Sequence, residues 1–159
     1  CRACGVPMTH VKAHGALYHR ACRDARAAQA LVQAVLRLDP GLVVVGPEGS
    51  ELLAAARQAG LPVAREAFPD RGYGPDGSLW PRGYPGSVVE DPEQAAARAV
   101  EMVVQGRVQA VDGSWLAVQA ETLCIHGDHP GAARVAARVR QALEEAGVQV
   151  VGFTRAEGR

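Results

Sequence analysis

The fold is decided by a short stretch that begins apolar and ends polar, LVVVGPEGS at residues 42–50. Its first four residues are aliphatic and mostly β-branched, which is typical of a strand buried on both faces of a parallel sheet. Residues 46–49 form a turn signal, and Ser50 is a favoured cap for a helix reaching about Ala59. The stretch therefore predicts a strand followed by a helix, the unit of an α/β fold.

The same pattern continues on both sides of this stretch. Residues 8–12 alternate in the manner of a strand that ends in a loop at Gly15, and residues 62–67 predict a third strand. Asp24 is a suitable cap for the helix between the first two strands. Its apolar positions recur at helical spacing: Ala27, Leu31, Ala34, Val35 and Leu38. The order βαβαβ predicts a parallel α/β sheet or barrel.

The second half begins with a long loop, residues 68–87, because five glycines and four prolines fall within these twenty residues. Residues 72–77 of the loop match the pattern G-x-G-x-x-G of dinucleotide-binding sites. Such a site needs a helix that begins at the motif, and none is predicted here, so we reject this interpretation. A helix is predicted from Pro92 to about Gln105, then a hairpin around residues 112–114 and a strand at residues 122–126. A helix at residues 130–146, with Ala133, Ala137, Val139 and Leu143 available for the core, precedes a last strand at residues 148–153 and a frayed tail of six residues.

Composition narrows the classes of function. The chain of 159 residues has a formal net charge of zero, which argues against a nucleic-acid partner, and no apolar run long enough to span a membrane. Cys1 and Cys4 form a lone C-x-x-C that we interpret as incidental, and Cys124 is expected to be buried and inert within a strand. Together with the absence of a visible signal peptide, these features predict a protein of the reducing cytoplasm.

Polar side chains follow three of the predicted strands. Lys12 is the only lysine beside sixteen arginines, which indicates a need for an amine at that position, although a surface ion is the alternative. Parallel strands end on one rim, so residues distant in sequence are predicted to line one pocket. The three sets are Lys12 with His14, Asp70 with Arg71, and His126 with Asp128.

These residue types favour acid–base chemistry on a carbonyl group. His126 is the candidate general base or acid, and Asp128 would orient it or a catalytic water. Lys12 and Arg71 would stabilise an oxyanion or hold a carboxylate. Two alternatives remain open at this stage. Asp70 and Arg71 could form a structural ion pair, and His126, Asp128 and His14 could bind a divalent metal.

Four segments resemble the LamB/YcsF family, and together they cover nearly the whole chain. HVKAHGALY at residues 10–18 is similar to the family signature His-Val-Lys-Pro-His-Gly-Ala-Leu-Tyr, with Ala13 in place of proline. The long loop resembles the family elements Phe-x-Asp-Arg-x-Tyr and Pro-Arg-x-x-Pro-Gly. ETLCIHGD at residues 121–128 resembles Asp-Thr-x-Cys-x-His-Gly-Asp, with Glu121 replacing the aspartate.

The length predicts a single domain over residues 1–159, and the sequence alone predicts a parallel α/β sheet with a β-hairpin insertion. The resemblance implies that the fold is a parallel (β/α) barrel of the glycoside hydrolase/deacetylase type. It also implies ATP-dependent opening of the 5-oxoproline lactam to L-glutamate, with partner subunits B and C. A P-loop needs a lysine followed by serine or threonine, and Lys12 is followed by Ala13, so ATP is expected as a cofactor of the complex but not in a P-loop of this chain. The candidate catalytic residues are Lys12, His14, Asp70, His126 and Asp128, and the candidate substrate-binding residues are Tyr18, Arg71, Arg82 and Thr122.

Two other functions compete with this one. A metal-dependent amide hydrolase of the deacetylase type would be sensitive to chelators and independent of ATP. A non-catalytic assembly protein would tolerate substitution of the site residues. Because the chain begins with Cys1, and the family has further acidic and histidine motifs before this point, we expect a fragment, incomplete at the N-terminus, that lacks part of the active site.

Overall fold

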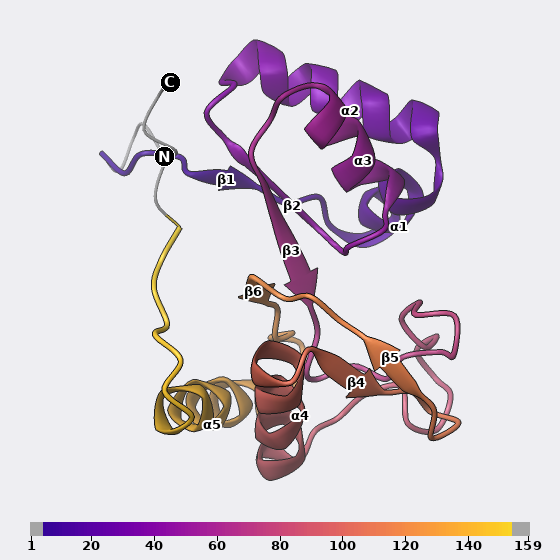
Figure 1. Ribbon diagram of the computed structural model, residues 1–159, viewed down its shortest axis with the longest axis vertical. Helices are drawn as coiled ribbons and strands as arrows, with labels where there is room; N and C mark the ends of the chain where they lie inside the picture. Colours follow the sequence, from indigo (N-terminus) through magenta and orange to yellow (C-terminus); the bar gives the residue numbers. More distant parts are fainter. Residues whose placement is uncertain (1–4, 154–159) are drawn as a thin grey trace. The chain divides into compact units, whose positions relative to one another are not determined.

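The computed structural model describes residues 5–153, which fall into two compact units (Figure 1). The first unit contains the described residues up to Arg65 together with Gly152 and Phe153, and the second contains Glu66–Val151. The chain passes from the first unit to the second within strand β3, Val63–Ala67. Cys1, Cys4 and the predicted six-residue tail lie outside the described residues.

Parallel strands form the centre of the first unit. Strand β2, Val43–Gly46, pairs with β1, His10–Val11, on one side, and with residues 63–65 of β3 on the other. The helices of this unit are α1, Gly15–Arg23, α2, Ala25–Leu38, and α3, Glu51–Gln58. All four residues of β2 are buried, as expected for a central strand with both faces covered. The predicted alternation of parallel strands and helices is therefore confirmed, with two helices between β1 and β2 where one was predicted.

Side-chain caps fix where these helices begin. Asp24 Oδ1 accepts hydrogen bonds from the backbone N–H groups of Arg26 and Ala27, at 2.9 and 3.2 Å, and so separates α1 from α2. Ser50 Oγ accepts from Leu53 N at 3.3 Å at the start of α3. Such caps satisfy N–H groups that lack a partner within the helix, and each contributes about 1 kcal/mol. Both helix starts were predicted from these residues.

Helix α1 was not predicted, because Gly15 was interpreted as a turn. The helix begins at that glycine, which has a φ of 57°, and buries Tyr18 and Ala21. The buried stripe of α2 also differs from the prediction. It consists of Ala28, Val32 and Val35, whereas Ala34 and Leu38 are exposed. Val32 and Val35 pack with Leu52 and Leu53 of α3 and Val44 of β2 in the core of this unit.

The second unit is built from two packed helices, a hairpin and a short parallel strand pair. Helices α4, Pro92–Val104, and α5, Ala132–Glu145, lie side by side (Figure 1). Strands β4, Arg107–Gln109, and β5, Trp115–Ala117, form the predicted antiparallel hairpin. The end of β3 pairs in parallel with β6, Thr122–Leu123, through Glu66 with Thr122 and Ala67 with Leu123.

Several predictions for this unit were wrong in detail. Strand β6 ends at Leu123, and Cys124 is half-buried, so the expectation of a sealed thiol fails. Residues 148–153 form no strand in the described part of the chain, although Val148 and Val150 pack against the core between α4 and α5. A strand needs a neighbouring strand to satisfy its backbone, and an apolar run alone does not supply one.

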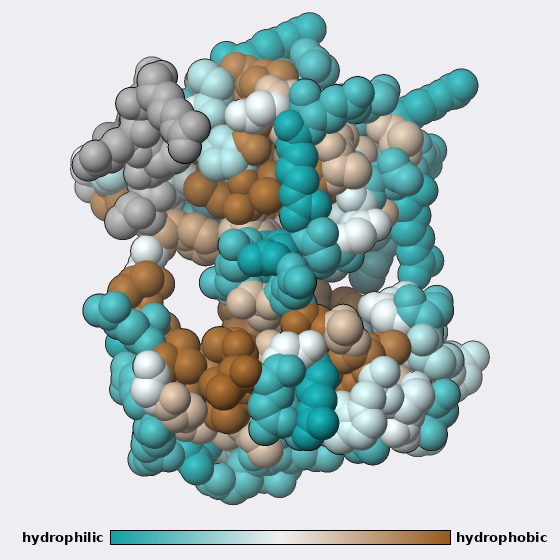
Figure 2. Space-filling model, in the orientation of Figure 1, coloured by the Kyte–Doolittle hydropathy of each residue, from teal (hydrophilic) through white to brown (hydrophobic). Residues whose placement is uncertain are grey.

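The core positions of α5 are Val135, Val139, Ala142 and Leu143, whereas the predicted Ala133 and Ala137 are exposed. Alanine is a weak marker of a helix face because it is compatible with both environments. Figure 2 shows apolar surface, in brown, remaining next to α4 and α5 among hydrophilic groups. No helix in the described part is both long and apolar enough to cross a membrane.

Candidate functional site

A buried carboxylate and an imidazole meet in the second unit. Asp70 Oδ2 accepts a hydrogen bond from the backbone N–H of His126 at 2.6 Å and lies 2.9 Å from Nδ1 of the same residue. The side chain of Asp70 is 2% exposed, whereas that of His126 is 27% exposed. The loop after β3 and the loop after β6 therefore deliver one residue each to a dyad, although 56 residues separate them in sequence.

The contact with Asp70 orients the imidazole of His126. A carboxylate accepts hydrogen bonds, so it favours the form of the ring in which Nδ1 carries the proton. Nε2 is then the acceptor, on a side chain that solvent reaches. This is the arrangement in which a histidine can remove a proton from water or a substrate. Asp128 was predicted to orient this imidazole or a catalytic water. In the structure it is Asp70 that contacts the ring, and the role of Asp128 toward a water remains a prediction.

One oxygen of the Asp70 carboxylate remains unsatisfied. Oδ1 is buried and has no hydrogen-bond partner among residues 5–153. A buried polar atom without a protein partner is costly, and in native proteins it is explained by strain, by a catalytic role or by a bound water or ion. The two oxygens of Asp70 thus have different surroundings, with Oδ2 engaged twice and Oδ1 not at all.

An aromatic ring supports the imidazole on one side. The rings of Phe68 and His126 stack with centroids 5.8 Å apart and an interplanar angle of 23°. A hydrogen bond fixes the backbone of Phe68, because its N–H donates to Tyr73 Oη at 2.9 Å. Burial raises the pKa of Tyr73 to about 12, so this hydroxyl stays protonated at physiological pH. Stacking and hydrogen bonding together limit rotation of the His126 ring.

Arg98 of α4 fixes the backbone around Asp70, and sequence reasoning missed it. Its guanidinium donates to the carbonyls of Pro69 and Arg71 at 3.2 and 2.9 Å, one on each side of Asp70, and to that of Gln109 at 3.3 Å. Burial lowers the pKa of this arginine. A signal was present in the sequence, because Arg98 falls on the helical stripe between the fully buried Ala95 and Met102.

Arg71 closes the base of the long loop. Its Nε donates to Ser87 O at 2.9 Å and one terminal nitrogen donates to Trp80 O at 2.8 Å, with the residue only 5% exposed. Burial lowers the pKa of its guanidinium. The alternative of a direct ion pair with Asp70 is not found among the described residues. The two arms of the loop also approach closely, since a Cβ on Gly72 would lie 2.1 Å from Gly86 O.

Asp128 and Arg82 form an exposed ion pair beside the dyad. Arg82 Nη1 and Asp128 Oδ2 are bonded, with the side chains 49% and 55% exposed. The hydrogen bond from Arg82 lowers the pKa of Asp128, so this carboxyl group is ionised near neutrality. The pair joins the tip of the long loop to the segment just after His126. Two candidates from different motifs are therefore brought together.

The first unit contains the remaining catalytic candidates. Lys12 is half-buried just after β1, with Nζ 5.8 Å from the centroid of the buried Tyr18 ring, a cation–π distance. His14 precedes α1 at its N-cap position, exposed and without a side-chain capping bond. Thr122 belongs to the second unit and is half-buried in β6. The prediction that these side chains share a pocket with His126 remains a prediction.

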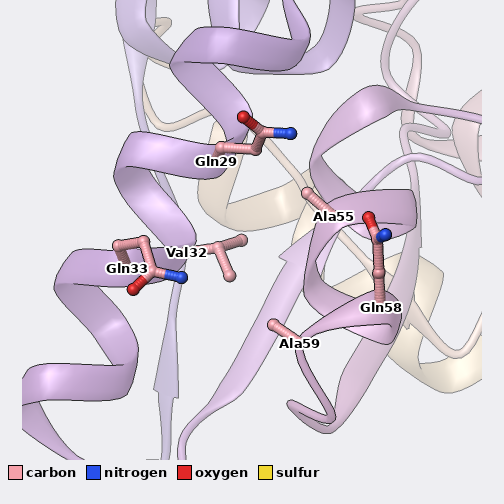
Figure 3. Close-up of a pocket in the computed structure, with 6 residues that line it drawn as sticks. All are labelled: Gln29, Val32, Gln33, Ala55, Gln58 and Ala59. Atoms are coloured by element: carbon pink, nitrogen blue, oxygen red, sulfur yellow. The ribbon is translucent and has the colours of Figure 1, made fainter.

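The possibility of a divalent metal remains a prediction. No three His, Cys, Asp or Glu side chains within residues 5–153 are grouped as a metal would require. His126 Nδ1 is engaged by Asp70, and Asp128 by Arg82. A hollow of about 330 Å³ between α2 and α3 is lined by three glutamines and small apolar residues (Figure 3). It contains none of the candidate site residues.

Comparison with known proteins links this geometry to a family. The model of the LamB/YcsF family matches residues 1–158. A protein of Thermus thermophilus, named as the A subunit of 5-oxoprolinase, is 55% identical over 152 residues, which are 96% of this chain and 61% of that protein. A protein of the same name from Pyrococcus abyssi is 43% identical over 150 residues, 94% of this chain and 59% of that protein.

A solved structure agrees with these matches. The crystal structure of a lactam utilization protein from Thermus thermophilus superposes with a TM-score of 0.86 at 53% identity, covering 94% of this chain and 59% of that one. The chain thus spans about three fifths of the length of the relatives it matches. Since the family model covers all but the last residue, the chain belongs to the LamB/YcsF family.

Proposed function

We propose that this chain is part of the A subunit of an ATP-dependent 5-oxoprolinase, which opens the lactam of 5-oxoproline to give L-glutamate. The single observation that supports this most strongly is the Asp70–His126 dyad, found in a chain whose relatives carry that name. A buried carboxylate that orients an accessible imidazole is suited to moving protons during hydrolysis of an amide.

In this proposal His126 acts through Nε2. It removes a proton from water as the water adds to the lactam carbonyl carbon, and it returns a proton to the ring nitrogen as the C–N bond breaks. Asp70 holds the ring in the required form and stabilises the imidazolium between these two steps. The stacked Phe68 ring keeps the imidazole in position.

The need for ATP follows from the chemistry of the substrate. An unstrained lactam is a poor electrophile, and transfer of the γ-phosphoryl group of ATP to its carbonyl oxygen makes the carbon easier to attack. When the C–N bond breaks, the phosphoryl group stays on the new carboxyl group as an acyl phosphate, and a second water hydrolyses this to glutamate and inorganic phosphate. Lys12 is the only lysine of this chain and lies outside any P-loop pattern, so this chain offers no P-loop for ATP, and in the proposal the partner subunits B and C take part in the phosphorylating step. Lys12 and His14 would complete the site, with Tyr18, Arg71 and Thr122 as further candidates for contact with substrate or its surroundings.

We also infer that the complete protein forms a (β/α) barrel of the glycoside hydrolase/deacetylase type and works in the cytoplasm. The parallel pairing of β1, β2 and β3, and of β3 with β6, supports the barrel. The division of the described chain into two units leaves the single-domain prediction open.

The test is reconstitution of the full-length protein with its partner subunits. With 5-oxoproline and ATP, we expect glutamate and ADP to form in step, and we expect no glutamate without ATP. His126→Ala should lower kcat at least about a hundredfold, the usual contribution of a general base. Hydrolysis that needs no ATP and stops on addition of a chelator would instead favour the metal-dependent amide hydrolase. Full activity of His126→Ala would favour the non-catalytic assembly protein.

A further inference from the structure

The two arginines of the long loop are bound in different ways. Arg71 is buried and its donors are engaged by the carbonyls of Ser87 and Trp80. Arg82 is half-exposed, and within residues 5–153 its bonded partner is Asp128, contacted through Nη1. A guanidinium has five N–H donors in a planar fork, so contact with one carboxylate oxygen leaves most of them available. Arg82 can therefore bind a second anion, whereas Arg71 is committed to the loop.

Asp128 holds this available guanidinium next to the dyad. Asp128 lies two residues after His126, and His126 contributes to the electrostatic environment of the Asp128 carboxyl group. An exposed ion pair of this kind adds little to stability, in general about 0 to 1 kcal/mol. Its effect here is to hold a cation beside the segment that bears the proposed base. The imidazole of His126 is itself partly open to solvent, so a small ligand can reach it.

We infer that Arg82 binds the carboxylate of the substrate, and so makes the site selective for lactams that carry an acid group. The inference rests on the proposed function, because 5-oxoproline has one carboxylate on the ring carbon next to the lactam nitrogen. In so small a ring, the carboxylate is close to the carbonyl that His126 would serve. A bidentate contact with a guanidinium would both attract the substrate and orient its ring.

The experiment compares two substrates in the full-length protein assembled with its partner subunits. One is 5-oxoproline, and the other is its amide, in which a carboxamide replaces the carboxylate. We expect Arg82→Gln to lower kcat/KM for 5-oxoproline about 10- to 100-fold, mainly through KM, the scale of losing one charge-assisted contact. The loss for the amide should be at least about tenfold smaller. Arg82→Lys should recover part of the preference, because it keeps the charge without the fork.

The matched control is Arg140→Gln. Arg140 is also an exposed arginine paired with a carboxylate, Glu144, but it lies on α5 outside the site. We expect its substitution to leave both substrates unaffected. Equal losses for acid and amide in Arg82→Gln, or no loss for either, would overturn the inference.

Calorimetric titration with 5-oxoproline separates this inference from the proposed function. If the wild-type assembly binds 5-oxoproline without forming glutamate, and Arg82→Gln weakens that binding but not binding of the amide, then the function fails while the role of Arg82 stands. If glutamate forms normally and Arg82→Gln binds 5-oxoproline as tightly as the wild type, then the function stands and the role of Arg82 fails.

Discussion

The buried carboxylate of Asp70 fixes the orientation of the His126 imidazole. Its carboxylate is nearly sealed from solvent and contacts the backbone and the ring of His126 through the same oxygen. In a medium of low dielectric constant such contacts are stronger than in water, and leaving either partner unpaired is costly. The imidazole is therefore held in one orientation by its contact with Asp70.

Tyr73 gives a prediction that depends on pH. Because burial raises its pKa from 10.0 to about 12, the folded state keeps the phenol proton at pH 11 while the unfolded state has lost it. Unfolding then releases a proton, so the free energy of unfolding should fall as pH rises from 10 to 12, by up to about 3 kcal/mol. Tyr73→Phe should show a smaller fall over this range in denaturant titrations. Equal pH dependence in both proteins would contradict the assignment.

Lys12 should be needed as an amine and not only as a charge. Its Nζ lies over the buried Tyr18 ring at 5.8 Å, in a space that a larger planar guanidinium would fill differently. We expect Lys12→Arg, in the full-length assembly, to reduce turnover at least about tenfold, equivalent to about 1.4 kcal/mol of barrier. Steady-state kinetics equal to those of the wild type would return Lys12 to the role of a surface ion.

At the scale of elements, the long loop is a closed and well-supported structure. Its two arms are joined by bridges between Arg71 and Val88 and between Tyr73 and Leu79, and by the guanidinium of Arg71. Arg98 anchors its base to α4. A loop with this many internal contacts can fix the position of Asp70, which a freely moving loop could not do.

Gly72 is the position where this loop is most sensitive to added volume. A Cβ there would overlap Gly86 O, and because that oxygen is a backbone atom, no side-chain rotation can relieve the overlap. We expect Gly72→Ala to lower the free energy of unfolding by more than about 2 kcal/mol, the scale of a severe steric conflict. Gly127→Ala is the matched control, because a Cβ there meets nothing within 4 Å. Chemical denaturation measures both, and equal stability would show that the arms do not pack as described.

The elements with a local signal were predictable from sequence. Asp24 and Ser50 cap their helices as expected, and the apolar run before Gly46 forms a buried strand. Helix α1 was missed because its first residue is a glycine, and residues 148–153 were assigned as a strand because apolar composition does not reveal whether a pairing partner exists. The first error comes from the usual association of glycine with turns, and the second from strand pairing, which the sequence of a segment alone does not show.

At the scale of the whole molecule, the structure shows contacts between residues that belong to different sequence motifs. Asp70 and His126 were each singled out from sequence, but their pairing across 56 residues follows from the parallel pairing of β3 with β6. Arg98 acts through backbone carbonyls, which every residue has, so its partners left no trace in the sequence. The sequence likewise did not show that Arg71 is buried whereas Arg82 is exposed and has donors available.

His14 and His126 belong to different units, and their cooperation is a prediction for the whole molecule. Parallel strands that end on one rim would bring both histidines to one pocket. If they act together, His14→Ala combined with His126→Ala should cost little more in kcat than the more damaging single change. If the factor by which kcat falls in the double variant equals the product of the factors for the two single variants, the two histidines act independently.

The most direct test of the central claim is the kcat of Asp70→Asn in the full-length protein with its partner subunits. Asparagine keeps the size of the side chain but can present an N–H group to Nδ1, which would favour the wrong form of the imidazole. We predict a fall in kcat of about a hundredfold or more, with KM within about threefold of the wild type. Asp128→Asn should have a smaller effect on kcat, since Asp128 contacts Arg82. A kcat for Asp70→Asn within about twofold of the wild type would contradict the claim that Asp70 orients His126 for catalysis.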